Sequence, residues 1–116
     1  MTAEIYTGIE PALQKSYRFS IDPHKFDYVT KAVFEKLNVD LSEISSHCRS
    51  RHCVEARHIS MYLLKIKTRA SLKSIGIYFG GRDHSTVIYA IQTVKDLMET
   101  NKFFKRTVDE LLEVLP

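Results

Sequence analysis

Hydrophobic residues from position 26 onward recur at helical spacing, with polar residues between them. The first apolar stripe consists of Phe26, Val29, Val33 and Leu37. These positions follow the i, i+3, i+7, i+11 pattern of one helix face. Asp22 is a suitable N-cap and Pro23 a suitable first helical residue. Asn38 can end the helix in a left-handed conformation. The pattern therefore predicts a helix from about residue 23 to residue 37.

The next part of the chain predicts a short helix, a loop and a longer helix. We expect the short helix at about 41–46, with Leu41 and Ile44 facing inward. Residues 47–52 are polar and aperiodic, which is typical of a loop. A helix over about 54–66 follows, because four apolar residues share one face. They are Ile59, Tyr62, Leu63 and Ile66.

Two further helices meet at a glycine pair. Ser71 is a suitable N-cap for a short helix with Leu72, Ile75 and Phe79 inside, and Gly80-Gly81 ends it. Asp83 is a suitable N-cap for a longer helix, whose apolar stripe is Val87, Ile91, Val94 and Met98. A last helix, over about 102–114, aligns Phe104, Val108, Leu111 and Leu115. Strand signals are absent. We predict an all-α bundle with a helix-turn-helix at about 71–100.

The length of 116 residues fits one domain. We expect an irregular N-terminal arm at 1–21 and a helical domain at 22–116. No apolar run approaches the ~20 residues of a membrane span. Cys48 and Cys53 offer no disulfide framework, so a reduced, cytoplasmic protein is the simplest expectation.

Positive charge is concentrated in the middle of the chain. The whole chain carries +3, but residues 47–86 hold eight Lys and Arg residues against Glu55 and Asp83, together with four of the five histidines. Such one-sided charge favours a polyanionic partner. The second helix of the predicted helix-turn-helix begins with the polar residues His84, Ser85 and Thr86. Recognition helices contact base edges with their N-terminal residues, so double-stranded DNA is the predicted partner. The alternative is an ordinary helical hairpin whose polar residues only cap the second helix.

Two segments carry a resemblance to a known family. They are Ser71-Leu72…Ile75-Gly76…Phe79-Gly80-Gly81-Arg82-Asp83-His84-Ser85-Thr86-Val87 and Ser50-Arg51…Ala56-Arg57-His58-Ile59…Met61. They resemble the recognition signature, basic loop and following helix of the C-terminal DNA-binding domain of DnaA, the bacterial replication initiator. The resemblance implies binding to a short, asymmetric, A/T-rich duplex site, in replication initiation or its regulation, and a nucleoid-associated location in a bacterial cytoplasm.

The resemblance also implies roles for individual residues. Asp83, His84 and Ser85 would face base edges in the major groove, and Arg49 would enter the adjacent minor groove. Phosphate contacts are expected for Arg51, Arg57, His58, Lys65, Leu72, Lys73, Arg82 and Thr86. An arginine suits a narrow A/T minor groove, where the negative potential is enhanced, and lysine serves as a point charge for phosphate.

The sequence gives little support for a cofactor, a metal ion or catalysis. Gly76 and Gly81 have P-loop spacing, but Arg82-Asp83 follows instead of Lys-Ser/Thr, so no nucleotide and no other cofactor is expected. We expect no enzymatic activity. A stand-alone protein that carries only this module is favoured over an excised domain. The alternative function is a protein-interaction or transcription-regulatory module derived from the same domain, with weak or altered DNA binding. His47, Cys48, His52, Cys53 and His58 could suggest zinc, but they lie in one short stretch, so no metal is expected.

Overall fold

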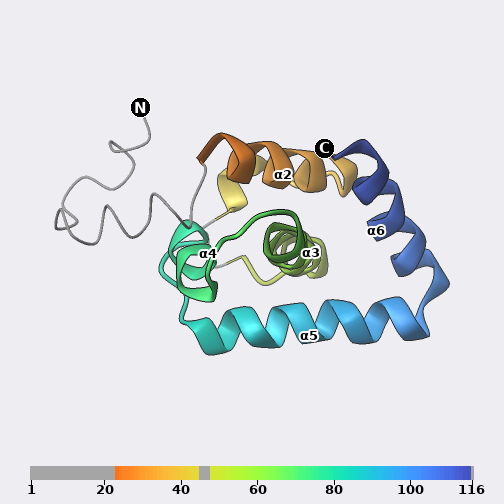
Figure 1. Ribbon diagram of the computed structural model, residues 1–116. Coiled ribbons are helices and arrows are strands. Elements are labelled where there is room, and N and C mark those ends of the chain that lie inside the picture. Colours follow the sequence, from red (N-terminus) through yellow and green to blue (C-terminus); the bar gives the residue numbers. More distant parts are fainter. Residues whose placement is uncertain (1–22, 45–47, 116) are drawn as a thin grey trace, which may run out of the picture.

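Helix α3 runs through the middle of the molecule, and the other helices pack around it (Figure 1). The computed structural model describes residues 23–44 and 48–115. Its elements are α2 (Pro23–Lys36), the 3-10 turn η2 (Leu41–Glu43), α3 (Arg51–Lys67), α4 (Leu72–Tyr78), α5 (His84–Thr100) and α6 (Lys102–Val114). In Figure 1, α2 and α5 lie on opposite sides of α3, and α4 and α6 close the two ends. These two stretches contain no strand, so the predicted all-α fold is confirmed.

Local capping fixes where the helices begin. Ser71 accepts a hydrogen bond from the backbone N–H of Ser74 at 3.1 Å, and Asp83 caps α5 as predicted. Ser50 caps α3 by accepting from the N–H of Cys53 at 3.3 Å. Helix α3 therefore starts at Arg51, and the predicted loop over 47–52 extended two residues too far. Asn38 has the predicted left-handed conformation, with φ of 60°.

The core consists of the apolar faces of all these helices. Its largest fully buried side chains are Phe26, Phe34, Phe79, Ile59, Met61, Leu63, Leu64 and Ile75. Two predicted core positions are wrong, because Ile66 is 49% exposed and Leu41 is 40% exposed. Ile66 lies in the last turn of α3, and Leu41 begins a 3-10 turn rather than a helix. Helical periodicity alone could not reveal that both positions lie beyond the reach of neighbouring helices.

The glycine turn between α4 and α5 brings these two helices together. Gly80 and Gly81 have φ values of 93° and 80°, a region that glycine enters without a steric penalty. The carbonyl of Gly76 accepts from the N–H groups of Gly81 at 3.0 Å and Arg82 at 2.9 Å. The chain therefore reverses tightly at the end of α4 and presents the start of α5 beside it. This confirms the predicted helix-turn-helix.

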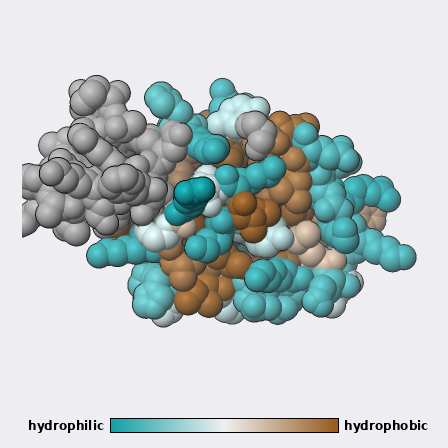
Figure 2. Space-filling view, viewed as in Figure 1, coloured by the Kyte–Doolittle hydropathy of each residue, from teal (hydrophilic) through white to brown (hydrophobic). Residues whose placement is uncertain are grey.

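The surface is mixed in polarity. In the view of Figure 2, hydrophilic side chains cover much of the described surface, and hydrophobic patches show between them. Among the helices of residues 23–44 and 48–115, none combines the length and apolar character that a membrane crossing requires. The predicted arm at 1–21 and the Asp22 cap lie outside the described residues.

Candidate nucleic-acid interface

A surface hollow of about 580 Å³ lies where α4, the glycine turn and α5 meet. It is lined by Leu72, Lys73, Ile77, Gly81, Arg82, Asp83 and His84. Five of these residues were predicted DNA contacts: Leu72, Lys73, Arg82, Asp83 and His84. Ser85 is exposed beside them in the first turn of α5. The fold thus gathers at one place the candidate residues for the major groove and several candidate phosphate contacts.

Asp83 holds the start of α5 through a double hydrogen bond. Its Oδ1 accepts from the backbone N–H of Thr86 at 2.9 Å and from the Thr86 hydroxyl at 2.8 Å. The backbone bond is the main reason that the pKa of Asp83 lies below its usual value. The carboxylate therefore stays negative and keeps its second oxygen for another donor. The hydroxyl proton of Thr86 already forms a hydrogen bond with Asp83. For Thr86 to donate this proton to a phosphate, as predicted, it would have to share or give up the bond to Asp83.

Arg57 is turned into the protein rather than outward. It is 7% exposed, and its guanidinium donates to the carbonyl oxygens of Cys48 at 2.6 Å and Glu43 at 3.4 Å. Burial is the main cause that lowers its pKa. The side chain fastens the segment before α3 to the middle of that helix. A phosphate contact for Arg57 stays a prediction, and the geometry gives this residue a structural role as well.

Three cationic or imidazole side chains meet beside the turn. Burial lowers the pKa of His58, and the nearby charges of Arg57 and Arg82 lower it further. A phosphate placed beside these groups would offset the repulsion between their positive charges. The Tyr89 ring lies edge-on to His58, with centroids 6.0 Å apart, and Tyr89 is 66% exposed. Tyr89 lies one helical turn after Ser85 on α5, where the sequence allows a contact with the DNA backbone but favours an exposed surface residue without one.

Four other candidate contacts, Arg49, Arg51, Lys65 and Lys73, are exposed. Arg49 is exposed in the segment before α3, and Arg51 begins α3 with a side chain that is 85% exposed, 3.8 Å from Glu55. Lys65 is exposed near the end of α3 and donates to the Ala70 carbonyl at 3.4 Å. Lys73 is exposed on α4.

Cys48 and Cys53 form a disulfide, which corrects the expectation of two reduced cysteines. The Cα atoms are 6.1 Å apart, within the usual range for such a bridge. Sequence spacing could not reveal the bridge, because the contacts of Arg57 and Ser50 bring the two residues together. The Glu43 carboxylate and both sulfurs lie within 4.8 Å of one another. Sulfurs bonded to each other provide no thiolate for a metal ion, so this group gives the zinc alternative no support.

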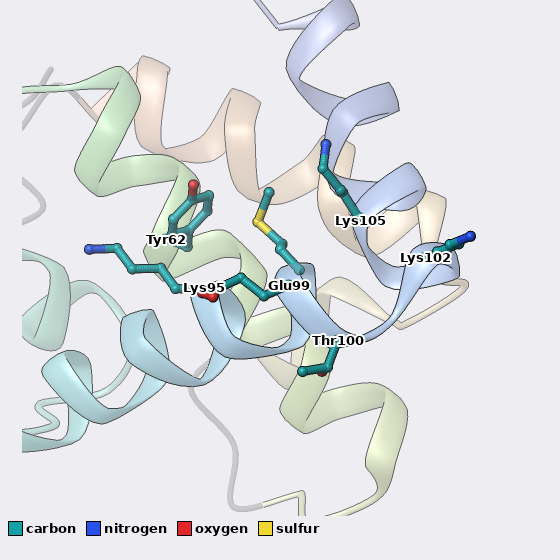
Figure 3. Close-up of a pocket in the computed structure, with 7 residues that line it drawn as sticks. Tyr62, Lys95, Glu99, Thr100, Lys102 and Lys105 are labelled. Atoms are coloured by element: carbon teal, nitrogen blue, oxygen red, sulfur yellow. The ribbon is translucent and has the colours of Figure 1, made fainter.

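A larger groove of about 720 Å³ lies elsewhere, between α3, α5 and α6. Figure 3 shows its lining residues, among them Tyr62, Lys95, Lys102 and Lys105. The three ammonium groups point in different directions, and Lys105 is paired with Asp109 at 2.8 Å. Because these charges do not converge, the groove offers no focused anion site. The hollow beside the glycine turn remains the stronger candidate.

Comparison with known proteins agrees with this geometry. A family model described as bacterial dnaA protein helix-turn-helix matches residues 26–94, which include α3, α4 and the start of α5. The chain belongs to this family. The matched range contains the hollow, the charged group around His58 and the segment that carries Arg49.

Individual relatives are similar over most of this chain. The chromosomal replication initiator protein DnaA of Flavobacterium psychrophilum is 44% identical over 85 residues, which is 73% of this chain and 18% of that protein. The protein of the same name from a Synechococcus strain is 37% identical over 89 residues, covering 77% of this chain and 19% of the relative. That of Rickettsia akari is 39% identical over 87 residues, with coverages of 75% and 19%. The chain thus spans less than a fifth of the length of these relatives.

His58 gives the stability of this region a predictable pH dependence. Its pKa in the folded protein lies below the ordinary value of 6.5, so the unfolded chain binds the proton more readily. The neutral imidazole contributes fully to the folding stability above pH 6.5, and this contribution is lost as the pH falls through the lowered pKa of His58. We expect the melting temperature to fall on acidification from pH 7.5 to about 5. The variant His58→Gln should flatten this dependence, whereas His52→Gln, an exposed control, should retain it. If the melting temperatures of the parent and of His58→Gln changed with pH in parallel, His58 would not be the source of the pH dependence.

Proposed function

We propose that this chain binds double-stranded DNA at a short, asymmetric, A/T-rich site, as a module of replication initiation or its regulation. The start of α5 would lie in the major groove, with Asp83, His84 and Ser85 at base edges. Arg49 would enter the neighbouring minor groove. Arg51, Lys65, Lys73 and Arg82 would contact phosphates.

The observation that carries this proposal is the hollow at the glycine turn. It combines a capped helix start, an acceptor at Asp83, an imidazole at His84 and the cations of Lys73 and Arg82. This combination suits DNA recognition, because phosphate contacts position a protein and base-edge contacts supply specificity. The exposed imidazole and hydroxyl of His84 and Ser85 supply both donors and acceptors. The similar proteins from Flavobacterium psychrophilum and Synechococcus are named as chromosomal replication initiators, which supports the same partner.

Selection from random duplexes tests this proposal. The immobilised full chain is incubated with a random-sequence duplex library, and bound DNA is sequenced after several rounds. We expect one asymmetric, A/T-rich motif to be enriched. The affinity for that motif should fall with salt, with a logarithmic slope of about −0.9 for each phosphate contacted. Absence of any enriched motif, together with weak binding at low salt, would contradict the proposal and favour a protein-interaction module.

Asp83 is expected to act both as a helix cap and as a base reader. In Asp83→Asn the amide oxygen can still accept from the Thr86 N–H, so the variant should melt close to the parent. The added amide donor should change the base preferred at one or two positions, because a carboxylate accepts only. The measurement is a repeat of the selection with the variant. Asp83→Ala is the control, since it loses the cap as well and should melt lower. An unchanged motif in Asp83→Asn would leave only the capping role.

The charged group around His58 predicts a second signature of DNA binding. A phosphate placed there would raise the pKa of His58, because it offsets the repulsion from Arg57 and Arg82. DNA affinity should therefore increase on acidification, while the stability of the free protein decreases. Anisotropy titrations of the parent and His58→Gln between pH 7.5 and about 5.5 measure this effect. Equal pH dependence in both proteins would place the phosphate away from His58.

A further inference from the structure

The disulfide lies within the segment that carries the candidate minor-groove residue. It joins Cys48, which precedes α3, to Cys53, the third residue of that helix. The ring that it closes contains Arg49, Ser50, Arg51 and His52, all of which are exposed. Arg49 and Arg51 are both proposed DNA contacts. The state of the two sulfurs therefore controls the backbone freedom of the segment that would meet DNA.

We propose that Cys48 and Cys53 form a reversible thiol–disulfide modification site that regulates DNA binding through Arg49. This inference rests on the proposed DNA-binding function. The proposal follows from a pair of cysteines and from contacts found in this chain, and the family resemblance does not imply it.

Contacts other than the bridge keep the two cysteines together. The Arg57 guanidinium holds the Cys48 carbonyl at 2.6 Å. The Ser50 hydroxyl oxygen accepts from the Cys53 N–H at 3.3 Å and lies 3.4 Å from the Cys48 sulfur. None of these bonds requires the sulfurs to be joined. After reduction they keep the thiols near each other, so the bridge can form again without refolding of the segment.

The positions of the sulfurs define the chemistry of the switch. Cys48 is half-buried, whereas Cys53 is 5% exposed, so a thiolate from solution reaches the Cys48 sulfur more readily. Attack breaks the bridge and forms a mixed disulfide at Cys48. Cys53 then leaves as a thiolate in the first turn of α3, where the helix N-terminus favours negative charge.

A second thiol completes the reduction. It attacks the mixed disulfide and releases the Cys48 thiolate. With glutathione, one protein disulfide and two glutathione molecules give one protein dithiol and one glutathione disulfide, so atoms and electrons balance. Oxidised glutathione drives the same exchange in reverse.

The closed ring should bind DNA more tightly than the open chain. The bridge already restricts the backbone around Arg49, so less conformational freedom is lost when this residue enters a groove. We expect the oxidised protein to bind about fivefold to tenfold more tightly, which corresponds to ordering roughly one residue. Linkage requires that bound DNA stabilise the disulfide against reduction by the same factor.

The test compares three forms of the full chain: the parent, the double variant Cys48→Ser/Cys53→Ser and the variant Arg49→Ala. Each is treated with oxidised glutathione or with a dithiol, with a metal chelator present throughout. The state of the cysteines is read by alkylation and mass spectrometry, and melting curves verify folding. Fluorescence anisotropy then measures the affinity of each sample for the duplex enriched in the selection.

We expect a fivefold to tenfold difference between the oxidised and reduced parent, as argued above. No difference is expected in the double-serine variant, which has no thiols, or in Arg49→Ala, which lacks the residue through which the effect acts. Equal affinities of the two parent forms would overturn the inference and leave the proposed function intact. A difference that persists in the double-serine variant would also overturn it. Failure of every form to bind any duplex would instead overturn the proposed function, and this inference with it.

Discussion

Replacing Gly76 with alanine is expected to lower the free energy of unfolding by about 3 kcal/mol, the upper part of the range for overpacked sites. Gly76 is buried in α4, and a Cβ atom there would lie 2.0 Å from the carbonyl oxygen of Arg82. The obstacle is backbone, so it cannot move aside as a flexible side chain would. Relief of this clash would move the turn that places α5 beside α4. Thermal unfolding measures the effect, and a decrease in melting temperature of more than about 10 °C is expected for a domain of this size.

Two control variants show whether the loss of stability in Gly76→Ala comes from this clash. Gly81→Ala meets no atom within 4 Å, but its φ of 80° disfavours a side chain, so a smaller loss of about 1–2 kcal/mol is expected. Lys73→Ala changes an exposed position on the same helix and should remain within about 0.5 kcal/mol of the parent. If Gly76→Ala melted with the parent, the described packing of the turn would be wrong.

Loss of Arg49 is expected to weaken specific DNA binding by about 1–3 kcal/mol, or roughly fivefold to 150-fold, as for one good base contact. Arg49 is exposed, so the variant Arg49→Ala should keep its melting temperature. The loss should be greatest on the duplex with the A/T-rich flank, because a narrow A/T minor groove attracts an inserted arginine. Arg49→Lys should recover only part of the affinity, since an ammonium is more strongly hydrated than a guanidinium.

The matched control for Arg49 is Arg51→Ala. Both residues are exposed cations beside the start of α3, but Arg51 is a candidate phosphate contact. Arg51→Ala should weaken all duplexes about equally and reduce the salt slope by about one unit. Titrations of the oxidised proteins against the enriched duplex and a duplex with a G/C flank distinguish the two residues. Equal discrimination between the flanks in the parent and in Arg49→Ala would remove the minor-groove contact from the account.

Much of the fold could be predicted because its signals are local. The caps at Ser71 and Asp83 follow from side chains that bond to nearby backbone N–H groups, and both are confirmed. The last helix, over Lys102–Val114, has the predicted bounds, because its apolar stripe is complete and Asn101 caps it. Ile66 and Leu41 were misplaced because burial depends on neighbouring elements as well as on periodicity.

The candidate site was predictable in its location but not in its internal contacts. The string from Gly80 to Thr86 identifies the turn and the start of α5, and the hollow lies there. The inward guanidinium of Arg57 was not foreseen, because a basic residue on a helix next to a basic loop has the same sequence pattern whether it faces DNA or loop carbonyls. The contact of Tyr89 with His58 was not foreseen, because it joins two helices that are distant in sequence.

The position of the DNA-binding surface is tested most directly by NMR of the isotope-labelled full chain as duplex is added. Backbone amide signals are followed during titration with the enriched duplex, and a scrambled duplex serves as the control. The account predicts that the largest shifts cluster at 49–51, 72–73 and 82–86, which meet DNA on the α4–α5 side of the molecule. Changes centred instead on the groove of Tyr62, Lys102 and Lys105, or no changes at all, would contradict it.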